Sequence, residues 1–200
     1  MQGDTKTTSK DLDMNSNSQS GQDIFVRLVF GRNFCGRFLD IGCCHPVDIS
    51  NTYQLEQEGW GGVLIDNDKN AIDLCKQKRL AKSIYADATT FDYRSLGDEC
   101  FDYVSLDVDA ASLLTLEQVL KCGIEASVWT IEHDAYRFGD EPRREMRKLM
   151  KNAGYYLLCS DVKNGGCPYE DWWIKPIFAP TLRKFECDGH DWKEIVGEYQ

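Results

Sequence analysis

Short apolar runs of strand length recur along the chain, and each has an acidic residue at its carboxyl end. The runs span residues 38–41, 61–66, 81–86, 101–107 and 127–132, and the acids are Asp40, Asp66, Asp87, Asp107 and Glu132. Apolar residues at helical spacing occupy intervening segments such as 69–79 and 113–121. This alternation predicts an α/β fold with a doubly wound, mostly parallel sheet.

The flanking segments extend this prediction. Helices are expected before the first strand, after a capping segment at residues 48–52, over 143–153 and around Trp192. The runs 155–162 and 171–175 are joined without a crossover helix, so we expect them to be antiparallel neighbours. Residues 1–17 are expected to form a flexible polar lead-in, and residues 18–200 a single domain.

Charge and composition narrow the function classes. The formal net charge of −10 disfavours a nucleic-acid partner, because a grip on phosphate backbones needs clustered Lys and Arg. We interpret the basic run at residues 143–151 as a solvated helix face. No run reaches the ~18 apolar residues of a membrane span, and residues 1–17 lack the apolar segment of a secretory signal. We therefore expect a cytoplasmic protein without a membrane partner.

The nine cysteines form no C-x-x-C pair, and the adjacent Cys43 and Cys44 are the only clustered ones. This spacing argues against a zinc site and against a disulfide framework. Reduced thiols, most of them small buried hydrophobic groups, are expected instead.

The row of acids at one sheet edge suggests a cofactor. The turn after the first strand, residues 40–46, has one glycine and a proline, and this is a poor seat for the diphosphate of a nicotinamide cofactor. S-adenosylmethionine is cationic and carries no phosphate. Asp40, Asp66 and Asp87 are placed to meet its amine or sulfonium side, its ribose diol and its adenine amino group. The alternative is that these acids only cap helices.

Several motifs together resemble the FkbM-type family of S-adenosylmethionine-dependent O-methyltransferases. They are S-Q-S-G-Q-D at 18–23, F-L-D-I-G at 38–42, S-N-T at 50–52, G-W-G-G-V-L-I-D at 59–66, D-Y-V-S-L-D-V-D at 102–109 and I-E-H at 131–133. The resemblance covers residues 18–176. It implies a class I methyltransferase (Rossmann-like) sheet of seven strands with the last antiparallel, and methylation of a hydroxyl, commonly on a sugar or polyketide. Cys43-Cys44-His45 and Ala110-Ala111 depart from the usual pattern of the family.

The expected site residues follow from these positions. Cofactor contacts are expected from Gln22, Asp23, Asp40, Gly42, Asn51, Thr52, Asp66, Asn67, Asp87, Ala88 and Asp107. Catalysis is expected from His133, Asp107, Asp109 and Glu132. His133 is the preferred base for the attacking hydroxyl, because a histidine is largely neutral at pH 7.

Two alternatives for these catalytic residues stay open. Asp107, Asp109 and Glu132 could together hold a divalent cation, Mg²⁺ or Mn²⁺, which would lower the pKa of the hydroxyl. His133 could also be a helix cap or a support behind the site.

The acceptor is expected to be a carbohydrate hydroxyl. Tyr136, Trp172 and Trp173 are candidates to stack on a sugar ring, although large aromatic residues are more often core. The alternatives are a polyketide or other small-molecule acceptor, a non-catalytic cofactor-binding partner subunit, and a nicotinamide-dependent reductase. The oligomeric state is left open.

Overall fold

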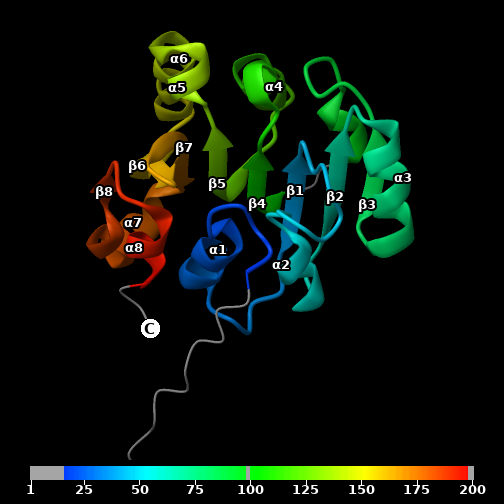
Figure 1. Ribbon diagram of the computed structural model, residues 1–200, viewed down its shortest axis with the longest axis horizontal. Helices are drawn as coiled ribbons and strands as arrows, with labels where there is room; N and C mark the ends of the chain where they lie inside the picture. Colours follow the sequence, from blue (N-terminus) through cyan, green and yellow to red (C-terminus); the bar gives the residue numbers. More distant parts are fainter. Residues whose placement is uncertain (1–15, 98–99, 198–200) are drawn as a thin grey trace, which may run out of the picture.

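The computed structural model describes residues 16–97 and 100–197, and a single mixed sheet forms its middle layer (Figure 1). The strands are β1 (Arg37–Ile41), β2 (Gly61–Asp66), β3 (Lys82–Tyr85), β4 (Phe101–Leu106), β5 (Ala126–Glu132), β6 (Tyr156–Asn164), β7 (Cys167–Ile174) and β8 (Cys187–Asp188). Their order across the sheet is β3-β2-β1-β4-β5-β7-β6-β8. The predicted doubly wound α/β fold is confirmed.

Strand direction agrees with the expected antiparallel pair near the end of the chain. The strands β1 to β5 pair in parallel, whereas β7 runs antiparallel to both β5 and β6. The eighth strand, β8, pairs in parallel with β6 and adds one strand to the seven that were expected. It has two residues, too few to show the alternation by which strands are recognised in a sequence.

Helices cover both faces of the sheet (Figure 1). On one face lie α1 (Gln22–Phe30), α2 (Tyr53–Gln57), α3 (Lys69–Lys78), α7 (Ala179–Leu182) and α8 (Trp192–Gly197). On the other lie α4 (Ser112–Lys121) and α6 (Asp140–Asn152). The short helix α5 (Ala135–Phe138) was not predicted. Within the described residues, no helix is both long and apolar enough to cross a membrane.

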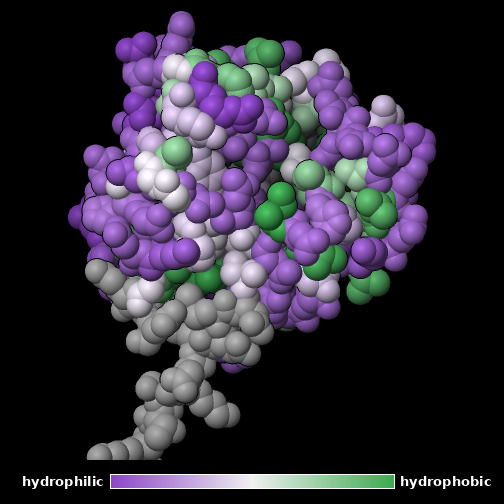
Figure 2. All heavy atoms as spheres, viewed as in Figure 1, coloured by the Kyte–Doolittle hydropathy of each residue, from purple (hydrophilic) through white to green (hydrophobic). Residues whose placement is uncertain are grey.

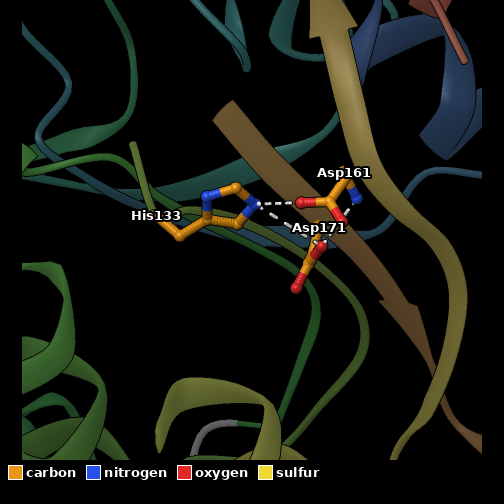
Figure 3. Close-up of side chains that lie close together, drawn as sticks. All are labelled: His133, Asp161 and Asp171. Atoms are coloured by element: carbon orange, nitrogen blue, oxygen red, sulfur yellow. Dashed lines mark hydrogen bonds and ion pairs between the residues drawn. The ribbon is translucent and has the colours of Figure 1, made fainter. Parts of the chain in front are cut away.

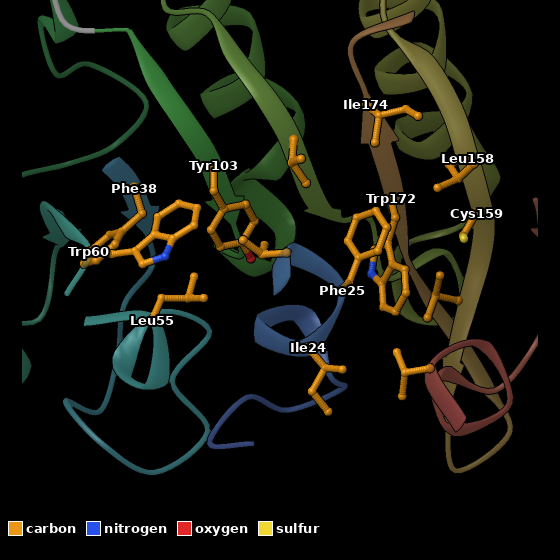
Figure 4. Close-up of a cluster of buried hydrophobic side chains, with 14 of the residues drawn as sticks. Ile24, Phe25, Phe38, Leu55, Trp60, Tyr103, Leu158, Cys159, Trp172 and Ile174 are labelled. Carbon is orange, nitrogen blue, oxygen red and sulfur yellow. The ribbon is translucent and has the colours of Figure 1, made fainter. Parts of the chain in front are cut away.

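The core between the sheet and α1 is rich in aromatic residues (Figure 4). Phe25 of α1 stacks on Trp172 of β7 with ring centroids 4.5 Å apart. Trp172 is fully buried, and Trp173 is equally buried on the opposite face of the sheet. Both tryptophans are therefore core residues and not sugar-stacking groups, because neither ring can be reached by a ligand.

Most of the predicted lead-in lies outside the described residues. Its last two residues are described, and both contact the domain: Ser16 Oγ donates to Asp23 Oδ1 (2.7 Å) and the Asn17 N–H donates to Asp23 Oδ2 (3.1 Å). The division into a lead-in and a single domain otherwise stays a prediction.

Candidate functional site

A cleft of about 560 Å³ opens at the carboxyl ends of the parallel strands. From β1 the strand order runs outwards to β2 and β3, and from the adjacent β4 it runs in the opposite direction to β5. Open α/β sheets bind ligands at such a reversal of strand order. The volume is within the range of small-molecule sites, roughly 300–1,000 Å³. Figure 2 shows mostly hydrophilic residues over this face of the molecule, which is hollowed near its centre.

Most of the predicted site residues line this cleft. They are Asp40, Gly42, Asn51, Asp66, Asn67, Asp87, Ala88, Asp107, Asp109 and Glu132. Four predicted residues, Gln22, Asp23, Thr52 and His133, do not line it. Their side chains point into the protein, as described below.

Gly42 brings three strand ends together at the floor of the cleft. Its N–H donates to Ile65 O of β2 (2.8 Å), while the Asp107 N–H donates to Ile41 O of β1 (2.9 Å). Gly42 has a φ of 87°, and a Cβ at this position would lie 1.7 Å from Asp107 O. A side chain is therefore excluded here, and the bare backbone can approach a ligand.

Asp40 is held in place from behind by Thr52. Thr52 Oγ1 donates to Asp40 Oδ2 (2.6 Å) and accepts from the Arg79 guanidinium (3.1 Å). Burial raises the pKa of Asp40 to about 6, although the Thr52 hydrogen bond and Arg79 act in the opposite direction. The Thr52 hydroxyl therefore binds within the protein and does not line the cleft, so its contact with the cofactor stays a prediction.

Two carboxylates at the ends of β2 and β3 are fixed by hydrogen bonds from the backbone. Asp66 accepts from the N–H groups of Cys44 and Asp68, both at 2.8 Å. Asp87 accepts from the Thr89 hydroxyl (2.7 Å) and N–H (2.9 Å), and these bonds lower its pKa. Each carboxylate keeps lone pairs for further donors, such as a ribose diol or an amino group.

Two buried polar atoms in the cleft wall have no partner. Asn51 donates through Nδ2 to Ser105 Oγ (2.9 Å), but its Oδ1 accepts nothing, and Thr115 Oγ1 is also unpaired. An unsatisfied buried polar atom costs about 1–3 kcal/mol, so atoms of this kind point to a ligand that would satisfy them.

The charge of the cleft is strongly negative. Its acids are Asp40, Asp66, Asp87, Asp107, Asp109, Glu132 and Asp134, and Arg137 is the one basic residue among the described lining residues. Such a wall repels phosphates and attracts cations. Together with the unpaired atoms, it fits a cationic nucleoside without phosphate, as S-adenosylmethionine is.

Asp107 and Glu132 form a carboxyl pair in the middle of this acidic wall. The two side chains are hydrogen-bonded to each other. Burial, this hydrogen bond and the neighbouring acids raise the pKa of Glu132 strongly, and burial also raises that of Asp107. The pair therefore retains a shared proton at neutral pH, as close carboxyl groups do.

Three acids of the cleft have the spacing of a metal site, but two of them already bind the guanidinium of Arg137. Ligand atoms of Asp109, Glu132 and Asp134 lie within 4.8 Å of one another. However, Arg137 Nη1 lies 2.6 Å from Asp109 Oδ1 and 2.8 Å from Asp134 Oδ2. A divalent ion would have to displace this guanidinium, so we derive no chemical step through a metal.

His133 does not line the cleft, and its side chain lies beside Asp161 and Asp171 (Figure 3); its role as the base stays a prediction. Its side chain is 1% exposed, and Nε2 points towards Asp161 Oδ1 (3.5 Å) and Asp171 Oδ1 (3.6 Å). β5 ends at Glu132 and the chain turns at Asp134, so that Glu132 and Asp134 line the cleft while His133 between them does not.

Gln22 and Asp23 are fully buried and do not line the cleft, so their cofactor contacts stay a prediction. Gln22 Nε2 donates to Tyr169 Oη (3.0 Å) and Glu170 Oε2 (3.1 Å), and Asp23 accepts from Ser18 Oγ (2.9 Å). Both residues tie down the segment that carries Gln19, which does line the cleft.

Sequence reasoning missed several lining residues on the β5 side of the cleft. Gln19, Asn164, Cys167 and Tyr169 come from the segment before α1 and from the β6–β7 hairpin. Only the tertiary pairing of β7 with β5 places this hairpin beside the cleft, and no local pattern records that pairing. Tyr136, a predicted stacking residue, also lines the cleft and is 55% exposed.

Several solved structures with the same fold are methyltransferases. A TehB-like SAM-dependent methyltransferase from Corynebacterium glutamicum is 16% identical, with a TM-score of 0.56 over 80% of this chain and 89% of that chain. The magnesium protoporphyrin IX methyltransferase of Synechocystis, solved with bound S-adenosylmethionine, is 12% identical, with a TM-score of 0.56 over 77% of each chain. An O-methyltransferase from Bacillus cereus in complex with S-adenosylhomocysteine is 16% identical, with a TM-score of 0.55 over 81% of this chain and 84% of that chain.

No protein-family model matches the chain, and no curated protein matches its sequence. At these levels of identity the structural likeness concerns the fold. The sheet, its antiparallel β7 and the position of the cleft all agree with that likeness. The chain has the fold of the class I S-adenosylmethionine-dependent methyltransferases.

Proposed function

We propose that this protein is an S-adenosylmethionine-dependent O-methyltransferase. The observation that carries the proposal is the acidic cleft at the strand-order reversal, with unpaired Asn51 Oδ1 and Thr115 Oγ1 in its wall. A cationic, phosphate-free nucleoside suits this wall, whereas a diphosphate cofactor does not.

The cleft residues divide into a cofactor group and a reacting group. Asp40 and Asn51 would meet the amine end of the cofactor, Asp66 and Asn67 its ribose, and Asp87 and Ala88 its base. Bound S-adenosylmethionine supplies an electrophilic methyl group. Asp107, hydrogen-bonded to protonated Glu132, is the group in the cleft best placed to take the proton of an attacking hydroxyl.

The finer proposal is an FkbM-type enzyme acting on a carbohydrate hydroxyl. It is supported by the S-Q-S-G-Q-D and S-N-T motifs, both of which lie beside the cleft. The β5 side also offers groups suited to a sugar: the amides of Gln19 and Asn164, and the exposed ring of Tyr136. A polyketide or other small hydroxylated molecule is the alternative acceptor.

Isothermal titration with S-adenosylmethionine, S-adenosylhomocysteine and NADH tests the cofactor. We expect micromolar binding of the first two ligands and none of NADH; NADH binding alone would support a reductase and contradict the proposal. Methyl transfer is then assayed on neutral glycans and polyketide alcohols, with and without EDTA. Cofactor binding without transfer to any acceptor would favour a non-catalytic subunit.

A further inference from the structure

A partly buried ionic cluster lies where β5, β6, β7 and α6 meet, and Figure 3 shows three of its residues, His133, Asp161 and Asp171. Arg147 holds Asp171 through two hydrogen bonds of 2.7 Å and also contacts Asp161 Oδ2 (3.0 Å). Arg143 donates to Asp161 Oδ1 (2.5 Å). Arg143 also pairs with Asp140, so two guanidinium groups serve three carboxylates before His133 is considered.

His133 inserts its imidazole into this cluster. The Ala135 N–H donates to Nδ1 (3.2 Å), so Nδ1 is the unprotonated nitrogen and Nε2 carries the hydrogen. Nε2 is buried and faces Asp161 and Asp171 at 3.5 and 3.6 Å, with no closer partner. The imidazole therefore directs Nε2 towards both carboxylates, at distances slightly too long for a hydrogen bond.

The same three residues have the geometry of a metal site, since their ligand atoms lie within 4.8 Å. The charges oppose that assignment. Arg143 and Arg147 already occupy the oxygen atoms of both carboxylates, so a divalent ion would have to displace these guanidinium groups. The cluster is therefore better explained as a structural connection between α6, the β6–β7 pair and the turn after β5.

Because His133 lies between two residues that line the cleft, this connection also affects the shape of the cleft. Its neighbours Glu132 and Asp134 both line the cleft, and Asp134 has a φ of 43°, an unfavourable conformation for a residue with a side chain. The N–H groups of His133 and Asp134 both donate to Tyr169 O, at 2.7 and 3.0 Å. The imidazole ring thus fixes the middle of a strained turn, and the carboxylates on either side of it, Glu132 and Asp134, line the cleft.

We propose that His133 is a positioning residue: its buried imidazole, which accepts from the Ala135 N–H at Nδ1 and lies against Asp161 and Asp171 at Nε2, holds the turn after β5 so that Glu132 and Asp134 face the cleft. This inference rests on the proposed function for its effect on catalysis, but the positioning itself can be measured without any ligand. It also explains why a histidine beside two carboxylates need not be the base.

Rescue by a conservative variant tests the proposal. A glutamine can place an amide N–H near the site of Nε2 but cannot act as a base, whereas alanine removes the donor. We expect His133→Gln to keep the backbone amide NMR shifts of Glu132, Asp134 and Tyr169, and His133→Ala to move them. We expect S-adenosylmethionine affinity and turnover within about threefold of wild type for His133→Gln, and ~10-fold losses for His133→Ala. The exposed His190→Gln is the matched control.

Several results would overturn the proposal. Equal loss of turnover in both His133 variants, with unchanged amide shifts, would make the imidazole the base. An imidazole ¹⁵N spectrum with the hydrogen on Nδ1 would exclude the hydrogen bond from the Ala135 N–H, and a shift of that spectrum on adding Zn²⁺ or Mn²⁺ would make His133 a metal ligand. If the wild type binds no S-adenosylmethionine, the proposed function fails, and the amide shifts alone decide whether His133 positions the turn.

Discussion

At the scale of single residues, the pKa of Asp40 gives the cleft a pH dependence. Burial raises this pKa to about 6, so the carboxyl is mostly protonated below that pH and ionised above it. A cationic ligand binds more tightly to the ionised Asp40 carboxylate than to the neutral acid. We therefore expect S-adenosylmethionine affinity to rise as the pH increases from 5 to 7.

Calorimetric titration of Asp40→Asn checks this expectation. The variant should bind ~10-fold more weakly at pH 7 and lose most of the change between pH 5 and 7, since a hydrogen bond to a charged group contributes roughly 1.5–3 kcal/mol. Asp73→Asn, on the exposed surface of α3, should behave like the wild type. An unchanged pH dependence in Asp40→Asn would assign it to other acids of the cleft.

Glu170 is a buried carboxyl that affects stability. Its oxygens accept from Trp172 Nε1 (2.6 Å) and Gln22 Nε2 (3.1 Å), and burial raises its pKa to about 8. A raised pKa means that the folded state holds this proton more tightly than the unfolded chain. Its contribution is therefore complete below the ordinary glutamate pKa and is lost as the pH rises through about 8.

Glu170→Gln should remove this dependence, because the amide resembles the protonated acid. Relative to the variant, the wild type should lose roughly 4 kcal/mol of unfolding free energy between pH 4 and 9, at about 1.4 kcal/mol per pKa unit. Urea unfolding at both pH values measures the difference, with Glu117→Gln on the exposed face of α4 as control. Parallel stability curves for wild type and Glu170→Gln would contradict the raised pKa.

The sequence allowed some residues of the cleft to be predicted and not others. The acids at the strand ends were predicted correctly to share one cleft, because strand termini of a parallel sheet meet at one edge. The direction of His133 could not be inferred from strand alternation, because β5 ends at Glu132 and Asp134 lies in a turn. The burial of Gln22 could not be inferred either, because it depends on Tyr169, which is far away in the sequence.

At the scale of elements, the turn after β1 depends on the absence of a side chain. Gly42→Ala would place Cβ 1.7 Å from Asp107 O and would also oppose a φ of 87°. We expect a loss of more than about 3 kcal/mol in unfolding free energy, or failure to fold, because the clash is with backbone that cannot move aside.

Gly139→Ala provides a matched control for this prediction. Gly139 has a nearly identical φ of 83°, but nothing lies within 4 Å of its Cβ position. Its substitution isolates the cost of the backbone conformation, roughly 1–3 kcal/mol, because a φ of 83° with a ψ of 176° is adopted almost only by glycine. Similar losses of unfolding free energy in the two variants would show that close approach to Asp107 is unimportant.

Element prediction succeeded where hydrophobic periodicity was long and failed where elements are short. The strands β1, β2, β4 and β5 and the helices α3, α4 and α6 lie where the apolar pattern predicted them. The four-residue α5 and two-residue β8 carry too few residues for a period. Because α5 supplies Tyr136 and Arg137 to the cleft, this failure affected the site more than the fold.

At the scale of the whole molecule, the two ends of the described chain support each other. A Cβ on Gly21 would lie 2.5 Å from Trp192 Cε3, so the ring of Trp192 in α8 packs directly on the segment before α1. Ile195 and Val196 of the same helix are buried in the core that contains Phe25. The segment that α8 covers also carries Gln19 into the cleft. The C-terminal helix should therefore influence ligand binding from a distance.

Ending the chain at Asp191 tests this connection. Burial of Ile195 and Val196 contributes about 1.5–3 kcal/mol each, so the loss of roughly 4 kcal/mol should lower Tm by about 10 °C at this chain length. Scanning calorimetry measures that change, and titration of the truncated protein at 15 °C should show weaker S-adenosylmethionine binding because Gln19 loses its support. The double variant Lys193→Ala, Glu194→Ala keeps the buried face of α8 and should match the wild type. Lowered Tm with unchanged affinity would show that α8 stabilises the fold without reaching the cleft.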